Sequence, residues 1–408
     1  MVKNSHINYP LASKVSLFFF FIVALAGTLL RSNVFISIPL EYEHLVHAHS
    51  HLAFQGWIYT IMTLFLTHFF LKKESYQRGR YSLQFYLTII IIIGILISFS
   101  LQGYGFYSII FSTLFQFLNY WFIFRFFKDT KKLKKASKIN IPLLFIKTGM
   151  WLGILSTLIP FGIGILSAKG LQGSEIYQSF VYTFLHLQYN GWFLFVALGL
   201  FYKLLESKSI QYHQKRAFNF YRLFTIAVIP AISLSFLGMS FSNYIAPIAY
   251  LSAILLLASL LYFIPSIWRS LKEFLTQKNK WIHLLMLVFL VSFVLKISLQ
   301  SCSVLPFCKA YAFQNKPIIL AYLHLSLIGV ITFFFIALMN ELKWLGNNGI
   351  NKTGNIFLTL GFISTESLLI TSGLGLYNNQ LLLLIGSAAM AVGIVCLLIS
   401  PQIKTEIQ

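Results

Sequence analysis

Apolar runs long enough to cross a membrane recur along the whole chain, between residues 14 and 399. Because a transmembrane helix needs about 20 mostly apolar residues, 408 residues leave room for roughly a dozen such helices. Only 10% of the residues are charged and 58% are hydrophobic, whereas soluble proteins are about a quarter charged. This composition excludes a cytosolic enzyme, a disordered chain and a soluble domain on a single anchor. We predict an all-α, polytopic membrane bundle that forms one membrane domain over residues 1–408, with no soluble domain.

Charged residues and Gly, Asn and Pro divide the apolar sequence into about twelve spans. They run over residues 15–32, 45–71, 82–102, 105–127, 141–167, 175–204, 218–240, 243–267, 281–300, 317–342, 355–376 and 380–400. No internal repeat is evident. The first run is followed by Arg31 and lacks a small-residue cleavage pattern, so we expect it to be retained as a helix.

The positive charges predict the orientation of the spans. If the N-terminus is cytoplasmic, the inner segments hold 25 of the 31 Lys and Arg residues, and one more, Lys147, lies within a span. The five on the outer side are Arg31, Lys169, Lys296, Lys309 and Lys316. The positive-inside rule thus explains the net charge of +21 without a nucleic-acid partner. We predict a protein of the cell (cytoplasmic) membrane with both termini in the cytoplasm, whose partners are membrane lipid and a redox protein. The basic segment 131–138 is interpreted as a contact for lipid headgroups.

Four of the ten histidines, His44, His47, His49 and His51, lie close together at the start of the second span. In a helix each residue advances by about 100°, so His47 and His51 share a face while His49 points about 160–200° away. Imidazoles in hydrocarbon are costly and need a partner such as a metal, water or another side chain. A metal or haem site is our interpretation. A hydrated outer funnel lined by neutral histidines is the alternative.

Two further spans carry histidines in the same half of the membrane, His186 and His324. At about 1.5 Å per residue, His51 lies about 9 Å below the outer boundary, His324 about 10–12 Å and His186 about 16 Å. Acidic side chains are almost absent nearby, and neutral imidazoles favour haem iron, copper or zinc over magnesium, calcium or manganese. The predicted metal ligands are therefore His47, His49, His51, His186 and His324. A hydrogen-bonded packing role is the alternative for each.

Two charged residues in the spans are further candidates. Glu366 lies near the middle of the eleventh span, where it either relays protons or stays neutral and bonds to the flanking hydroxyls. Arg31, at the outer end of the first span, is placed to pair with a haem propionate or to anchor the helix at the interface.

Two of the three cysteines, Cys302 and Cys308, lie in an outer loop. Because the outer compartment permits disulfides and this loop needs something to order it, we predict a Cys302–Cys308 disulfide, with a thiolate metal site as the alternative.

Histidines on the second, sixth and tenth of twelve spans resemble the pattern of subunit I of the haem–copper oxidases. In that family the second and tenth helices supply the axial ligands of a low-spin haem, the tenth also ligates a high-spin haem, and the sixth and seventh ligate copper. The resemblance implies that His51 or His47 faces His324 across a haem and that His186 takes a copper-side position.

The His47-Ala48-His49 element is also similar to the His-Ala-His-Glu stretch of the NnrS family, whose members are haem- and copper-containing membrane proteins linked to nitric oxide stress. By this resemblance His49 serves a second site, or a hydrogen bond that orients a ligand.

The sequence departs from the oxidase pattern at three places. The sixth helix of the family carries His-Pro-Glu-Val-Tyr, whereas here His186 is followed by Tyr189 three residues later and not by a tyrosine four residues later. The seventh span, 218–240, has no histidine, and the tenth has one in place of two. These departures argue against an oxygen-reducing binuclear centre of the usual composition.

The sequence therefore predicts an integral membrane protein that binds haem, copper or both. Its expected role is electron transfer, the handling of a diatomic gas such as nitric oxide or oxygen, or metal sensing and delivery, and whether it is an enzyme is left open. One alternative is a His-dependent transporter of metal ions or protons without haem. The other is a structural or assembly partner of a respiratory complex.

Overall fold

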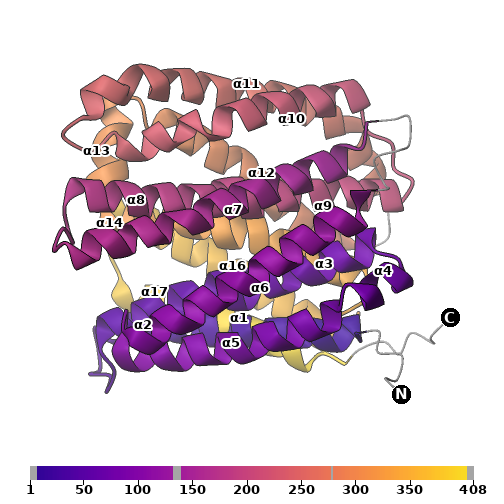
Figure 1. Ribbon diagram of the computed structural model, residues 1–408, viewed down its shortest axis with the longest axis horizontal. Helices are drawn as coiled ribbons and strands as arrows, with labels where there is room; N and C mark the ends of the chain where they lie inside the picture. Colours follow the sequence, from indigo (N-terminus) through magenta and orange to yellow (C-terminus); the bar gives the residue numbers. More distant parts are fainter. Residues whose placement is uncertain (1–6, 132–138, 277–278, 402–408) are drawn as a thin grey trace. The chain divides into compact units, whose positions relative to one another are not determined.

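The computed structural model describes residues 7–131, 139–276 and 279–401, and all regular secondary structure in these ranges is helical (Figure 1). This confirms the predicted all-α class. An isolated segment in hydrocarbon must satisfy its backbone N–H and C=O groups internally, and a helix does so within one segment. His6, most of the basic segment 131–138 and the lysines at positions 3, 278 and 404 lie outside the described residues.

Ten helices or helical runs in the described ranges are long and apolar enough to cross a membrane, which makes the chain a multi-pass membrane protein. They are α1 (Tyr9–Ser32), α5 (Tyr81–Gln102), α6 (Phe106–Asp129), α7 (Ile141–Ala168), α8–η3–α9 (Glu175–Leu185, His186–Phe193 and Leu194–Ser207), α11 (Ser242–Leu275), α12 (Lys280–Cys302), α14–η5–α15 (Lys316–His324, Leu325–Thr332 and Phe333–Glu341), α16 (Gly349–Gly373) and α17 (Gln380–Ile399).

Two more helical runs lie where spans were predicted. The helix α10 (Gln214–Val228) and the 3₁₀-helix η4 (Pro230–Phe236) pass the same test together but are bent by 48°. Pro230 stands at this bend, where its missing N–H interrupts the helical hydrogen bonding. The segments α2 (Tyr42–His51), η1 (Leu52–Tyr59) and α3 (Thr60–Phe70) form one continuous run. Each predicted range thus overlaps a helix or helical run, and that all twelve cross the membrane stays a prediction.

The helices form two compact units, each described by itself. Unit 1 comprises residues 1–136, 335–372 and 377–408, in which α1 packs against α2, η1 and α17, and α5 packs against α2 and α6. It also holds the short helix α4 (Lys73–Arg78). Unit 2 comprises residues 137–334 and 373–376, in which α7 packs against α8, η3 and α9, and α11 against α10 and α12. The single membrane domain predicted over residues 1–408 stays a prediction.

Three π-helical stretches reveal an internal similarity that the sequence analysis missed. Each of η1, η3 and η5 begins at a histidine or directly after one, His51, His186 and His324. Each of these histidines opens the same pattern, His-Leu-x-x-x-Gly. In each case the preceding long helix, α1, α7 or α12, packs against the π-helical stretch. The repeat is short and degenerate, which is why it is inconspicuous in the sequence.

The connection after α12 is ordered without a disulfide, which corrects the prediction for Cys302 and Cys308. Both are free thiols. A backbone hydrogen bond of 3.0 Å from Leu305 to the Cys302 carbonyl closes the turn, and the helix α13 (Pro306–Gln314) follows at once with a proline in its first turn. The ordering that was attributed to a disulfide is thus supplied by the backbone.

Glycines allow α16 and α17 to approach closely in unit 1. A Cβ atom added at Gly361 would lie 2.6 Å from the Gly386 carbonyl oxygen, and one added at Gly354 would lie 2.8 Å from the Gly393 carbonyl oxygen. Since these neighbours are backbone atoms, they cannot move aside as a flexible side chain would. Small residues at such positions are what lets two membrane helices pack backbone to backbone.

We expect Gly361→Ala to lower the free energy of unfolding by about 1–3 kcal/mol, the usual cost of overpacking. Gly164→Ala, in α7, is the matched control because its added Cβ meets nothing within 4 Å. Its effect should stay below about 1 kcal/mol. Unfolding in mixed micelles measures both, and equal effects of the two substitutions would contradict the packing described for α16 and α17.

Candidate functional site

His47 and His51 lie on one face of α2 in unit 1, as the helical spacing predicts. The His51 ring stacks on Phe99 of α5 with a centroid distance of 4.0 Å, and the His47 ring lies 6.4 Å from the same ring. Both imidazoles also contact Tyr104, with ring centroids 4.6 Å from His47 and 5.7 Å from His51. Two imidazoles one turn apart therefore share one aromatic surface.

The other two histidines of the cluster make different contacts. His49 points to α1, where its Nδ1 lies 2.9 Å from the Val23 carbonyl oxygen and its ring lies against Gly27. Because a carbonyl only accepts, His49 donates through Nδ1–H. His44 packs against Gly103. The prediction that His49 faces away from His47 and His51 is confirmed.

Tyr104 is the residue of this site that sequence reasoning missed. It lies in the three-residue connection between α5 and α6, and its hydroxyl is 3.0 Å from His51 Nε2. Gly103 adopts the left-handed conformation of this turn, with φ of +57°. A Cβ atom added there would lie 2.6 Å from the His44 ring. The short Gly-Tyr-Gly connection is the signal that could have identified Tyr104, because it must bring that side chain to the end of the helix pair.

Arg31 and Glu366 belong to one electrostatic pair in unit 1. Arg31 is in the last turn of α1 and Glu366 is in α16, close enough for an electrostatic interaction between the two groups. The hydroxyls beside Glu366 donate elsewhere: Ser364 to the Gly361 carbonyl at 3.0 Å and Thr365 to the Phe362 carbonyl at 3.0 Å. The two roles considered for Glu366, a proton relay or a neutral carboxyl group bonded to flanking hydroxyls, both stay predictions.

Unit 1 also contains a small cavity beside α4, where hydroxyl- and amide-bearing residues alternate with apolar surface. Its polar lining residues are Tyr59, Thr63, Thr67, Tyr76, Tyr81, Gln84 and Thr88. Burial raises the pKa of the Tyr76 phenol above its usual value, so this lining group stays protonated at neutral pH. Gln84 donates from Nε2 to the Gly79 carbonyl at 2.8 Å. The hydroxyl and amide groups in this lining are suitable partners for ordered water.

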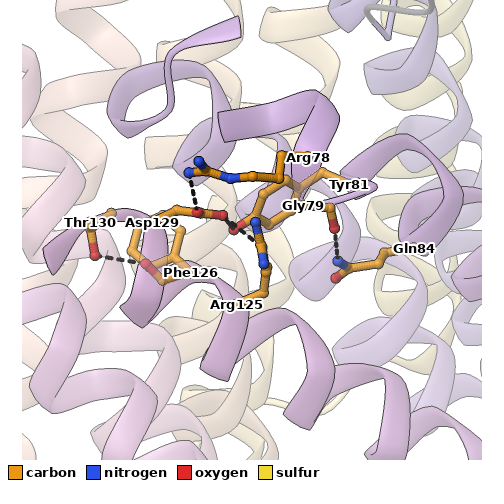
Figure 2. A network of polar contacts seen from close by, with 8 residues as sticks. All are labelled: Arg78, Gly79, Tyr81, Gln84, Arg125, Phe126, Asp129 and Thr130. Carbon is orange, nitrogen blue, oxygen red and sulfur yellow. Dashed lines mark hydrogen bonds and ion pairs between the residues drawn. The ribbon is translucent and has the colours of Figure 1, made fainter. Parts of the chain in front are cut away.

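A network of charged groups closes the α4 side of the same region (Figure 2). The Asp129 carboxylate, whose side chain is 1% exposed, accepts from Arg125 Nε at 2.9 Å, Arg78 Nη2 at 3.2 Å and the Tyr81 hydroxyl at 3.1 Å. Arg125 is on the same helix, four residues earlier, whereas Arg78 and Tyr81 come from α4 and α5. Asp129 therefore ties the end of α6 to the segment between α3 and α5.

His186 is buried in unit 2 with both ring nitrogens in hydrogen bonds. Nε2 lies 2.8 Å from the Val228 carbonyl oxygen, so it carries the proton, and Nδ1 accepts from the Asn190 amide at 3.1 Å. In this arrangement His186 has no lone pair to offer a metal, so it does not fit the predicted copper-side role. Asn190 stands four residues after the histidine, where the oxidases have their tyrosine.

Lys296 is a buried basic side chain that the sequence analysis counted among the charges of the outer side. It was placed on the outer side, but it lies within α12 and is 1% exposed. Its Nζ donates to the Asn190 side-chain oxygen and, at 3.0 Å, to Gln300 Oε1. Gln300 Oε1 also accepts from the Tyr322 hydroxyl at 3.1 Å. Hydropathy averaged over a span of 20 residues hides one buried lysine, which is why it was missed.

The two remaining candidates also lie in unit 2. The Tyr189 ring meets the Tyr322 ring edge to face, with centroids 6.4 Å apart, and so turns toward α14. His324 is the last residue of α14 and is half-buried. In the described part of either unit, no three His, Cys, Asp or Glu side chains are grouped closely enough to hold a metal ion. The predicted five-histidine ligand set is therefore not assembled within one unit.

Comparison with known proteins gives no family. No protein-family model matches the sequence, and a search of curated proteins finds no match.

Removing the charge of Asp129 tests the network at the α4 side of unit 1. We expect Asp129→Asn to lower the free energy of unfolding by about 1–3 kcal/mol, because the largely buried Arg125 guanidinium loses its carboxylate. Arg78→Gln removes an exposed partner of the same carboxylate and should cost less than about 1 kcal/mol. Unfolding in mixed micelles compares the two. A larger loss for Arg78→Gln than for Asp129→Asn would be inconsistent with the network as described.

Proposed function

We propose that this protein binds haem or copper through imidazoles in the outer half of the membrane and that it transfers electrons or handles a diatomic gas such as nitric oxide or oxygen. The membrane is the cytoplasmic membrane, both termini lie in the cytoplasm, and about twelve spans cross it. This count includes α2–η1–α3 and the bent pair α10–η4. The partners are membrane lipid and a redox protein.

The single observation that carries the proposal is the position of three histidines. His51, His186 and His324 each stand at the start of a π-helical stretch. A π-helix is rare and is frequently found at functional sites, because its extra residue redirects side chains at a cost in backbone geometry. Three such stretches at three membrane histidines favour a function for the histidines over simple packing.

The residues of unit 1 fit an imidazole-bound group better than those around His186. His47 and His51 offer two nitrogens from one helix face, and neutral imidazoles are ligands of haem iron and copper. His51 Nε2 becomes available when Tyr104, which comes from a connection and is 61% exposed, gives up its hydrogen bond. Phe99 keeps the His51 ring in place by stacking. His324 is the corresponding candidate of unit 2.

In this proposal the bound metal supplies the one-electron step or the coordination of the gas, and the protein supplies orientation and a low-dielectric surrounding. The hydrogen bond from His49 to the backbone of α1 fixes the orientation of α2 about its axis. With α2 in this orientation, His47 and His51 face Phe99. Arg31 and Glu366 interact electrostatically in unit 1, and this pair is a candidate for propionate binding or for proton transfer.

A proton-pumping oxygen reductase is disfavoured by the residues themselves. The described part of α10 and η4 contains no histidine, so the copper ligands expected on that helix are missing. Asn190 stands where the oxidases have a tyrosine, four residues after His186. Its amide donates a hydrogen bond to His186 Nδ1, so this nitrogen is not available to a metal. These observations favour electron transfer or gas handling over oxygen reduction.

Visible spectra of the protein purified in mild detergent test the proposal. We expect a Soret band with α and β bands that sharpen on reduction by dithionite, or stoichiometric copper by elemental analysis. His51→Ala should reduce the bound haem or copper at least tenfold, because a ligand nitrogen is removed.

His49→Gln is the matched control, since a glutamine amide can still donate to the Val23 carbonyl and the position faces away from His51. It should retain most of the haem or copper. If His51→Ala retained as much haem or copper as the wild type, the assignment of the metal ligand to α2 would be refuted. A colourless, metal-free protein from haem-replete cells would refute the proposed function.

A further inference from the structure

Lys296 is a buried basic side chain whose hydrogen-bond partners in the described part of unit 2 are neutral. Its Nζ donates to the side-chain oxygens of Asn190 and Gln300, which are amides and carry no charge. The residues described include no carboxylate in contact with Lys296. The described acids of unit 2 are Glu175, Glu206 and Glu273, all near helix ends. A permanent charge at this position would therefore be buried without a counter-ion, which is costly in a membrane.

The hydrogen bonds around Lys296 require two donors from its nitrogen. A neutral amine has two N–H bonds and one lone pair, so it satisfies both amide oxygens as fully as an ammonium does. An ammonium has a third N–H, and among the described residues Nζ forms only these two hydrogen bonds. Lysine is the basic side chain that readily loses its proton on burial, whereas arginine does not.

The neighbouring groups hold the amine in one place. Asn190 Oδ1 faces Lys296, so its Nδ2 faces His186, and the Val228 carbonyl fixes the other end of that imidazole. On the other side, the Tyr322 hydroxyl donates to Gln300, the second partner of the amine. Amides do not titrate, so a proton must reach the nitrogen lone pair directly.

The ionisable groups around Lys296 come from two elements packed near α12. From η3 they are His186 and Tyr189, and from α14 Tyr322. The π-helical stretch η5, which packs along α12, carries no ionisable side chain and begins directly after His324. The helix α10 contributes only the Val228 carbonyl to this chain of hydrogen bonds. The ionisable side chains of α11, Tyr244, Tyr250, Tyr262, Arg269, Lys272 and Glu273, form no described hydrogen bond or ion pair with Lys296.

We propose that Lys296 is a proton-binding site inside unit 2, an amine at rest that takes up one proton. In this step the nitrogen lone pair forms an N–H bond with a proton delivered by hydronium, whose O–H bond breaks to leave water. The site then carries one positive charge, so proton uptake places a charge in the membrane interior. This inference is independent of any haem or copper.

Nuclear magnetic resonance of the full-length protein labelled with ¹⁵N at lysine Nζ tests the proposal. We expect one lysine signal in the amine position at about pH 8 that moves to the ammonium position on acidification, while exposed lysines stay ammonium to about pH 10. The amine signal should be absent in Lys296→Met and present in Lys147→Met, a matched control in the span α7. An ammonium signal for Lys296 at every pH up to about 9 would overturn the proposal.

A pair of substitutions gives a second readout that does not depend on resolving the signal. Lys296→Met is neutral and should fold with a melting temperature near that of the wild type. Lys296→Arg cannot lose its proton and should melt lower than Lys296→Met. An arginine variant that is as stable as the wild type, with a methionine variant that is less stable, would show a permanent cation and contradict the proposal.

Discussion

The absence of water in the hydrocarbon region is the constraint on which the structure depends. Every buried polar group must find a partner in the protein, and the backbone does so by forming helices. Polar side chains in the spans often follow the same rule locally, as Thr67 and Ser259 do by donating to carbonyls of their own helix. Groups that break this local pattern are therefore informative, and they are the π-helical stretches, the histidines and Lys296.

Two polar centres emerge, one in each unit. In unit 1 the imidazoles of His47 and His51 share an aromatic surface made by Phe99 and Tyr104. In unit 2 a buried chain of hydrogen bonds joins His186 to Lys296 through Asn190. In our proposals the imidazoles of unit 1 offer nitrogen lone pairs to a metal, and the amine of Lys296 in unit 2 offers its lone pair to a proton. A histidine at the start of a π-helix can thus serve two different chemistries, depending on what its ring nitrogens meet.

Hydropathy predicts the helices well because each span satisfies its own backbone, so local sequence decides its ends. The spans expected from residues 141 and 175 begin at Ile141 and Glu175. The rotation of His47, His51 and His49 also followed from spacing alone. By contrast, the partners of His186 and Lys296 lie on other helices, and no local pattern specifies them. The disulfide prediction failed for a related reason, since the helix α13 that orders the connection was read as a loop.

The most direct test of the central claim is the iron and copper content of the wild-type protein, purified from membranes of haem-replete cells and measured by mass spectrometry against protein concentration. Binding of haem or copper predicts close to one or more metal atoms per chain, retained through gel filtration. A content near zero for both metals would contradict it, and would leave the histidines as hydrogen-bonding or proton-binding groups.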